Sequence, residues 1–338
     1  MNNKTKTLTT TKYHVALLAI TMSMLGSQAH AAVNLRLAVP DPAQSSVGQA
    51  ASRFAELVDE KTGGEVTFQV FPDGVLFSGD QNAAINQLGS GALDGLILAS
   101  SVYASFEPRM NAISLPYLFS DYEQLQAYLD GEPGQELLQS LSRLNIHGLD
   151  FFLRTFRNVT TRDTAITTAD DFSGITLRTP NNPLFVELFK ALGANPTPMA
   201  FSEVYSALQL EAIDGQENPV EVPYNNRFYE VQGHLNMTQH VADAFLLALS
   251  DNAWQRIPEE YRDEVQQAAN EMTAERNQIE IDQEQEIIEK LKDEGMQVNQ
   301  LADGELERIQ ATAQGVYSEF SDTIGEEFMQ KSLDFVNQ

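Results

Sequence analysis

Hydrophobic and polar positions along the chain form short stretches of two kinds. In segments 33–39 and 65–71 apolar side chains follow the alternation of a strand with one buried face, whereas in 47–60 they have helical spacing. A further helix at 81–88 leads into the apolar run 93–99. The order strand, helix, strand, helix, strand predicts a mostly parallel sheet covered by helices.

A second α/β unit begins near His147. Segments His147–Leu153 and Gly174–Thr179 are predicted strands. In the helix that follows, Asn182 is the predicted N-cap, Pro183 the first helical residue and Gly193 the terminating position. The chain is therefore predicted to hold two α/β units.

Helical spacing continues without a break from Pro258 to Glu294. At 1.5 Å per residue this segment spans roughly 54 Å, longer than one ordinary domain. It predicts a helix that bridges two domains, and two helices separated by a kink are the alternative. No internal repeat or low-complexity linker marks a domain boundary, which favours a chain that crosses twice between the domains.

The first residues have the features of a secretory signal peptide. Three lysines and no acidic residue precede an apolar run at Val15–Leu25, and Ala29-His30-Ala31 supplies small residues at the −3 and −1 positions. We expect cleavage after Ala31, giving an exported, soluble protein. The apolar run is shorter than the about 20 residues needed to span a membrane, and no later stretch is longer. Without cysteine there is no lipid attachment point, so we expect a periplasmic location.

Composition narrows the classes of function. The 338 residues include 48 acidic and 21 basic side chains, for a net charge of −27. Loss of residues 1–31 removes three lysines, which leaves 18 basic residues and a charge of −30. Such a chain is unsuited to phosphate backbones, so nucleic acid is not the expected partner.

The sequence offers little for catalysis. Its histidines are scattered without metal-ligand spacing, and it lacks a Gly-x-Ser-x-Gly elbow, a Gly-Lys-Ser/Thr phosphate loop and a Gly-x-Gly-x-x-Gly fingerprint. We expect no metal, no cofactor and no enzyme activity.

Four arginines instead lie close together in this chain of few basic residues, at Arg154, Arg157, Arg162 and Arg178. Arg178 ends a predicted strand, and ligands of open α/β sheets bind beyond the carboxyl ends of the strands. The N-terminus of the following helix adds partial positive charge. A guanidinium can hold a carboxylate through two parallel hydrogen bonds, so an anionic ligand is predicted there.

Several ordered motifs resemble the substrate-binding proteins of tripartite ATP-independent periplasmic (TRAP) transporters, the DctP family. The resemblance covers essentially the whole chain after residue 31. The motifs that carry it are Phe71–Gly74, Leu115–Phe119, Arg157–Thr161, Asp171–Arg178, Leu192–Tyr205, Ala207–Gln209, Asp214–Pro219 and Glu230–Gln232.

The resemblance implies an α/β fold of two lobes, a periplasmic-binding-protein-like clamp with mixed sheets flanked by helices and a long helix that crosses both lobes. We assign residues 32–154 and about 244–283 to lobe I. Lobe II is assigned residues 155–243 and about 284–338.

The resemblance also implies roles for single residues. Arg178 matches the arginine that pairs with the ligand carboxylate, Asn218 the asparagine that hydrogen-bonds it, and Phe201 an aromatic wall. Arg157 matches a second, more variable arginine, for which Arg154 is the substitute. Asn181 lies where ligand contacts are frequent, and the far wall is expected around Asp80, Ser100 and Tyr103.

The expected ligand is a small organic acid, either a sugar acid such as a uronate or aldonate, or a C4-dicarboxylate. Members that bind sialic acid carry Glu and Arg near the positions of Ser100 and Tyr103, so sialate is disfavoured. The implied partners are the small and large membrane subunits of a TRAP permease driven by an ion gradient, without an ATPase. The alternatives are a binding protein that serves a sensor or another importer, an exported enzyme, and a structural envelope protein.

Overall fold

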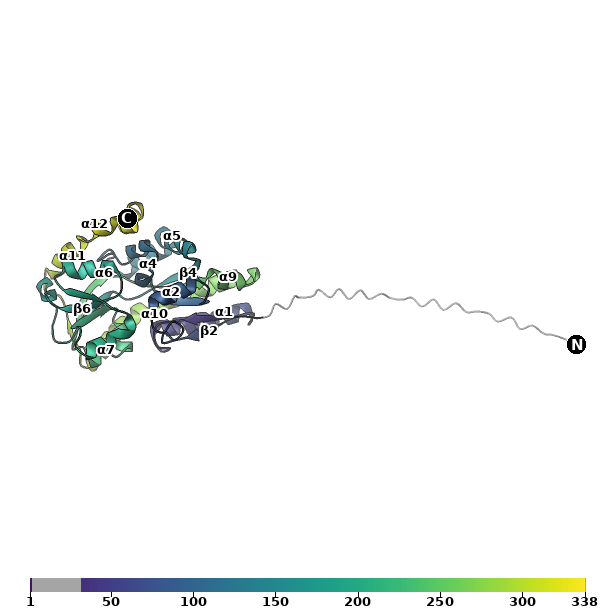
Figure 1. Cartoon of the computed structure of the whole chain (residues 1–338), viewed down its shortest axis with the longest axis horizontal. Coiled ribbons are helices and arrows are strands. Elements are labelled where there is room, and N and C mark those ends of the chain that lie inside the picture. The colour runs from purple at the N-terminus through teal and green to yellow at the C-terminus, as the bar shows by residue number, and fades with distance from the viewer. Residues whose placement is uncertain (2–31, 338) are drawn as a thin grey trace. The chain divides into compact units, whose positions relative to one another are not determined.

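The computed structural model describes residues 32–337, together with Met1. The predicted signal peptide and its cleavage site after Ala31 lie outside the described residues. Two sheets, each flanked by helices, form the body of the structure (Figure 1). In the described part of the chain no helix is both long and apolar enough to span a membrane.

The first sheet has the strand order β2-β1-β3-β10-β4. Its strands are β1 (Val33–Ala38), β2 (Val66–Phe71), β3 (Gly95–Ala99), β4 (Ile146–Leu153) and β10 (Ala244–Ser250). The expected parallel arrangement holds for β1, β2 and β3. Strand β10 enters between β3 and β4 and runs antiparallel to both. This sheet is therefore mixed, because a strand from late in the chain is inserted into it.

The second sheet has the order β11-β9-β5-β8-β6-β7 and is also mixed. Its strands are β5 (Arg157–Thr161), β6 (Thr176–Thr179), β7 (Asn195–Pro198), β8 (Gly215–Asn218), β9 (His234–Val241) and β11 (Gln297–Asn299). Strand β6 is parallel to β7 and to β8, so the carboxyl ends of these three strands meet at one edge. Strand β5 runs antiparallel to β8, which brings its first residue, Arg157, to the same edge.

The chain passes between the two sheets in both directions. Residues 154–156 connect β4 to β5, and residues 242–243 return from β9 to β10. These short connections explain why no linker is visible in the sequence: each is a continuation of one strand into the next. The exact lobe boundaries remain a prediction.

The long helix is continuous, and the kinked alternative is wrong. Helix α10 (Arg262–Asp293) follows a short 3-10 turn at Glu259–Tyr261 and ends before Gly295. Its first half packs Val265 and Met272 into an apolar cluster with the first sheet and α1 (Ser46–Thr62). Its second half packs Leu291 into another cluster with residues of the second sheet. The single helix α10 thus packs against residues of both sheets.

Shorter helices cover the sheets, and one of them follows the predicted capping. Helix α6 (Pro183–Ala191) begins after Asn182, whose side chain accepts a hydrogen bond from the Leu184 N–H at 2.9 Å. The chain then turns at Gly193, where φ is +89°. The other helices before α10 are α2 (Gln81–Gly89), α3 (Ser100–Tyr103), α4 (Tyr122–Asp130), α5 (Glu132–Ser140), α7 (Val204–Gln209), α8 (Glu221–Asn225) and α9 (Asp251–Arg256).

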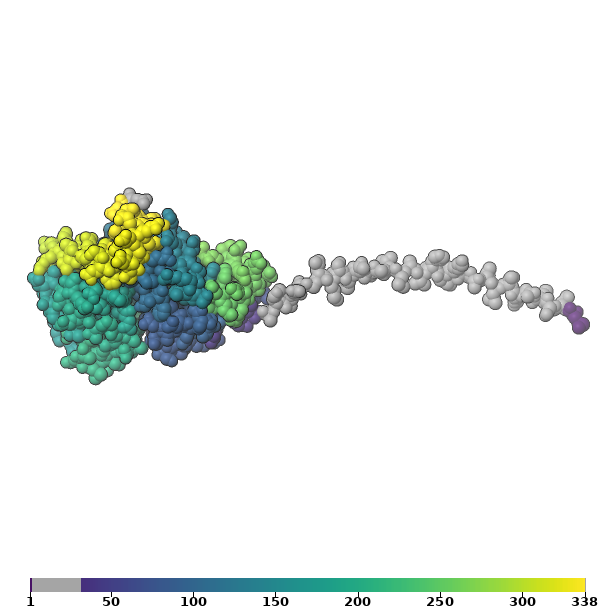
Figure 2. Space-filling view, turned by 45° about the horizontal axis from the view of Figure 1, so that its top comes forward, coloured from purple at the N-terminus to yellow at the C-terminus, as the bar shows by residue number. Residues whose placement is uncertain are grey.

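The C-terminal helices lie across both parts of the molecule. They are α11 (Glu305–Gln314), α12 (Tyr317–Ile324) and α13 (Glu326–Val336). Helix α11 contacts α6, whereas α13 contacts α4 and α5, and the Tyr128 hydroxyl is 2.7 Å from that of Ser332. Figure 2 shows this yellow segment over the teal and the blue regions. Helix α13 thus contacts helices that cover the first sheet, and the assignment of about 284–338 to lobe II stays a prediction.

Candidate functional site

Arg178 lies in β6, at the edge of the second sheet where the carboxyl ends of the parallel strands meet, and only 4% of its surface is exposed. Its Nε and Nη2 donate to the carbonyl oxygen of Met199, at 3.1 and 2.8 Å. Within the described residues no carboxylate pairs with this guanidinium. Burial lowers the pKa of Arg178 to about 10, with Glu217 opposing the change and Arg157 adding to it, so the side chain remains a cation at neutral pH.

Arg157 lies at the same edge but is neutralised by protein carboxylates. Its Nε is 2.5 Å and its Nη2 2.8 Å from the Glu217 carboxylate, and its Nη1 is 2.9 Å from Asp243. Burial works against the Glu217 carboxylate, yet Arg157 lowers its pKa to about 2. Protein carboxylates therefore hold Arg157 at the edge of the sheet, and its role as a second ligand arginine stays a prediction.

Arg154 occupies the crossing segment next to these groups. Its Nη1 lies 3.0 Å from Asp243 and its Nη2 3.1 Å from Glu221, while its guanidinium stands 4.4 Å from the centre of the Phe245 ring. Its Nε is buried and has no hydrogen-bond partner in the described part of the chain. Of these three arginines, Arg178 alone has no carboxylate partner among residues 32–337.

Asn218 ends β8, beside β6, and is 5% exposed. Its Oδ1 accepts from Arg157 Nη2 at 3.1 Å, and its Nδ2 donates to Gln216 Oε1 at 2.6 Å. This arrangement brings Asn218 to the carboxyl ends of the parallel strands, near Arg178.

A cavity brings these side chains together. Arg178, Asn218, Arg157 and Arg154 all line it, as does Phe201, and its volume is about 40 Å³. The remaining lining residues are Pro40, Asp41, Gln81, Leu98, Ala99, Ser101, Val102, Pro180, Val222 and Phe245. These residues come from both sheets or from the segments that follow their strands, so the cavity lies between the two sheets.

Two adjoining cavities, of about 30 and about 220 Å³, extend the hollow. Phe201 and Gln81 line all three cavities, and Phe201 faces the Arg178 guanidinium at 5.9 Å. Asp80 and Asn181 line the smaller of the two. The Asp80 carboxylate also caps α2, accepting from the Ala83 N–H at 3.0 Å.

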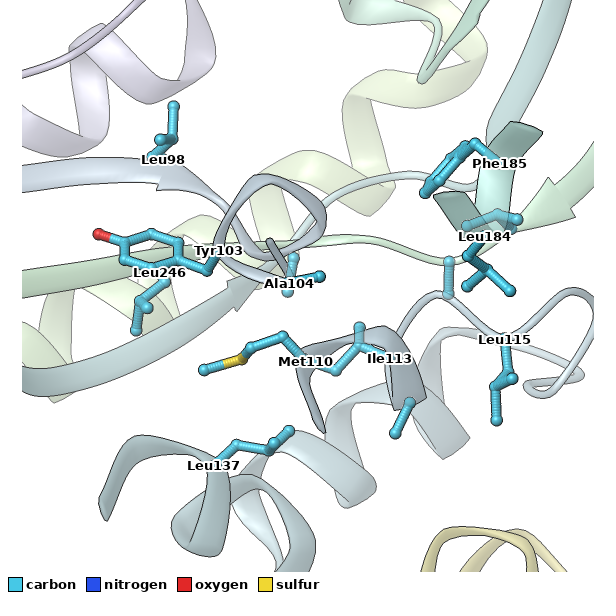
Figure 3. Close-up of a cluster of buried hydrophobic side chains, with 14 of the residues drawn as sticks. Leu98, Tyr103, Ala104, Met110, Ile113, Leu115, Leu137, Leu184, Phe185 and Leu246 are labelled. Carbon is cyan, nitrogen blue, oxygen red and sulfur yellow. The ribbon is translucent and has the colours of Figure 1, made fainter. Parts of the chain in front are cut away.

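The structure places Ser100 and Tyr103 away from this cavity. Ser100 is fully buried and donates to Asp243 at 2.9 Å. Tyr103 is also fully buried and packs in the apolar cluster of Figure 3, with Leu98 and Leu246. Ser101 and Val102 line the cavity instead. Both residues lie in the short helix α3, whose turn directs 101 and 102 to the cavity and 100 and 103 to the interior.

Sequence reasoning missed Asp41 and Gln81. Asp41 follows β1, so the rule about the carboxyl ends of strands points to it as it did to Arg178. Gln81 opens α2 directly after its cap, Asp80, and lines the cavity.

A larger cavity, of about 780 Å³, lies elsewhere, between β4, α4, α5 and α10. No arginine or lysine lines it, and Asp130, Asp150 and Asp251 do. An anion is therefore disfavoured there and favoured beside Arg178. Among the described residues no cluster of three or more His, Asp or Glu has the arrangement of a metal site.

The chain is similar to proteins with known ligands. A family model described as bacterial extracellular solute-binding protein, family 7, matches residues 38–323. The sialic acid-binding periplasmic protein SiaP of Vibrio cholerae is 33% identical over 92% of this chain and 97% of its own length. The C4-dicarboxylate-binding periplasmic protein DctP of Rhodobacter capsulatus is 31% identical over 91% of this chain and 96% of its own.

Structural comparison agrees with this. The crystal structure of the sugar acid binding protein DctPAm from Advenella mimigardefordensis, in complex with galactonate, has a TM-score of 0.86 and 30% sequence identity. The match covers 90% of this chain and 97% of that one. The chain therefore belongs to the bacterial extracellular solute-binding protein family 7, the DctP family of TRAP transporter substrate-binding proteins.

Proposed function

We propose that the protein captures a small organic acid by its carboxylate and delivers it to a TRAP permease. The observation that carries this proposal is Arg178: a buried cation that lines a cavity and has no carboxylate partner among the described residues. Burial of an unpaired charge is costly, and a ligand carboxylate would supply the missing partner. Relatives named for sialic acid, C4-dicarboxylates and a galactonate complex all have carboxylate ligands.

The residues around Arg178 are suited to this task. Its Nη1 has no protein partner in the described residues, and reorienting from the Met199 carbonyl would free a second donor for a two-point contact with the carboxylate. Asn218 would hydrogen-bond the same carboxylate, and Phe201 would cover the ligand. Arg157 would hold Asn218 in place and supply positive potential.

Binding requires the two halves to move. The cavity volume of about 40 Å³ is far below the about 300–1,000 Å³ of small-molecule sites. An open form would admit the ligand, and the ligand's contacts with both sheets would favour the closed form. The closed form would then be the one recognised by the small and large membrane subunits. We also propose export to the periplasm through a signal peptide cleaved after Ala31, which N-terminal sequencing of the exported protein tests.

The test of carboxylate capture is Arg178→Ala, measured by titration calorimetry with the acids that stabilise the wild type in a thermal-shift screen. A ligand at 100 times its Kd adds about 2.7 kcal/mol of stability. We expect the substitution to cost about 2–5 kcal/mol of binding free energy, because the carboxylate loses its charged partner. The affinity of Arg178→Lys should lie between those of the wild type and Arg178→Ala, since lysine keeps the positive charge but cannot donate two parallel hydrogen bonds to the carboxylate.

Arg308→Ala is the matched control, because Arg308 is an exposed arginine on α11 that pairs with Asp170. It should bind ligand as the wild type does. Wild-type affinity in a folded Arg178→Ala protein, or no stabilisation of the wild type by any uronate, aldonate or C4-dicarboxylate, would refute the proposal.

A further inference from the structure

Two side chains of opposite charge that line the candidate ligand cavity each hold a buried polar atom without a partner in the described part of the chain. The side chains of Asp41 and Arg154 both line it, and they are 9% and 4% exposed. Asp41 Oδ1 and Arg154 Nε are buried and make no hydrogen bond with any described residue. Buried polar atoms of folded proteins are nearly always paired, so this pair of orphans marks a place where a ligand group is needed.

The chemistry of the orphans selects the ligand group. Asp41 Oδ1 can only accept while it is ionised, and Arg154 Nε can only donate. A hydroxyl both donates and accepts, so one hydroxyl, or two neighbouring ones, satisfies both atoms. A carboxylate would satisfy Arg154 and be repelled by Asp41, whereas a methylene would leave both atoms unpaired. Gln81, an amide that lines the same cavity, offers one more donor and acceptor for hydroxyls.

The local charge balance also limits the ligand. The arginines that line the cavity are Arg154, Arg157 and Arg178, three cations. The acids that line it or pair with these arginines are Asp41, Glu217, Glu221 and Asp243. With four acids against three cations the site carries no surplus positive charge for a second ligand carboxylate. Arg178 has no carboxylate partner among the described residues, so one anionic group held there is the most that this arrangement favours.

We propose that Asp41 and Arg154 form a hydroxyl-binding subsite, so that the ligand is a hydroxylated monocarboxylate of the sugar-acid type and not a dicarboxylate. The inference rests on the proposed function, because Arg178 is taken as the anchor of the carboxylate. Asp41 follows a strand of the first sheet and Arg178 belongs to the second. A ligand that bridges the two groups therefore touches both halves, and its hydroxyls contribute to closure.

Four probes separate the two subsites in titration calorimetry: gluconate, with one carboxylate and a chain of hydroxyls; hexanoate, with the carboxylate alone; mannitol, with the hydroxyls alone; and succinate, with two carboxylates. The wild type should bind gluconate at least about tenfold more tightly than hexanoate or succinate, and should not bind mannitol. Asp41→Ala should weaken gluconate binding by about tenfold or more and leave hexanoate binding unchanged. Asp41→Asn keeps the shape of the side chain and removes its repulsion of a ligand carboxylate. It should therefore reduce the difference in affinity between gluconate and succinate.

The control is Asp303→Asn, which removes the same charge from an exposed aspartate that lines none of these three cavities. It should behave as the wild type does with all four probes. Circular dichroism and melting curves establish that the Asp41 variants are folded, and Asp41→Asn carries the test if Asp41→Ala is not.

The outcomes distinguish this inference from the function on which it rests. If no carboxylate binds the wild type, carboxylate capture itself fails. The hydroxyl subsite is refuted if hexanoate or succinate binds the wild type as tightly as gluconate does. It is also refuted if both Asp41 variants keep the wild-type ratios of affinity between the probes. In either case the carboxylate site at Arg178 stands. That second result is also what a permanently trapped water between Asp41 and Arg154 would produce.

Discussion

Arg154, Arg157 and Arg178 lie close together in the sequence but differ in their ion-pair partners. Arg157 and Arg154 share the carboxylate of Asp243, and each has a further acid, Glu217 and Glu221. Removal of one partner from such buried pairs typically costs about 3–5 kcal/mol, because the other charge is left buried and unpaired. Arg178 has no such partner among the described residues, so its charge is available to a ligand.

An acid whose pKa is raised in the folded state makes stability depend on pH, even where it lies away from the ligand cavity. Asp150 on β4 is a clear case: burial raises its pKa from 3.8 to about 6, although hydrogen bonds from Thr273 and the Phe151 N–H oppose the rise. The folded state therefore holds the proton more tightly than the unfolded state does. Its favourable contribution is complete below pH 3.8 and is lost as pH rises through about 6.

Asp150→Asn should remove this dependence. The difference in unfolding free energy between the variant and the wild type should grow between pH 4 and pH 6 and stay constant above, at up to about 3 kcal/mol in favour of the variant. Urea denaturation at pH 4, 5, 6 and 8 measures it. Asp303→Asn, at an exposed aspartate, should show no such growth. An Asp150→Asn protein that is less stable at pH 8 than the wild type would contradict the assignment.

At the scale of elements, helix α10 is tied to the point where the chain leaves the first sheet. The Asn277 side chain of α10 accepts a hydrogen bond from the backbone N–H of Leu153, at 2.7 Å, and Leu153 is the last residue of β4. Arg154, which lines the ligand cavity, comes next. A hydrogen bond from the helix thus holds the start of the crossing segment.

Asn277→Ala should lower the unfolding free energy by about 1–3 kcal/mol, because it leaves a buried N–H without a partner. The control is Asn270→Ala, at an exposed asparagine on the same helix. It should change the unfolding free energy by less than about 0.5 kcal/mol. Urea denaturation compares the two variants. Equal effects of the two substitutions would show that the Leu153 contact contributes nothing specific.

At the scale of the whole molecule, the acidic surface should oppose capture of an anion. The full chain carries a net charge of −27, and the three lysines of residues 1–31 are not part of the predicted exported protein. Long-range repulsion decays within about 10 Å in 0.1 M salt. The short-range attraction of Arg178 inside the cavity is screened much less.

The association rate for an anionic ligand should therefore rise with added salt, while the dissociation rate changes little. Stopped-flow measurements between 10 mM and 500 mM sodium chloride test this with an acid that the thermal-shift screen identifies. A rate that falls with salt would mean that the arginines steer the ligand from a distance and that the acidic exterior has no effect on capture.

The alternation of apolar positions determined the elements that build the site. The strand that holds Arg178, the cap at Asn182 and the unbroken helix α10 depend on local spacing and backbone hydrogen bonding, which neighbouring residues in the chain control. The motifs around Arg178 and Asn218 indicated the family because several of them occur in order along the chain.

Only the tertiary structure decided which polar groups meet and which remain unpaired. Strand β10 returns from the far end of the chain, so the partners of Arg154 and Arg157 include Asp243, which lies 89 and 86 residues away. The orientation of α3 gives Ser101 to the cavity and sends Ser100 and Tyr103 to the interior. Charge pairing and burial depend on contacts between distant segments, and for that reason the free charge of Arg178 and the orphan atoms of Asp41 and Arg154 appear only in the fold.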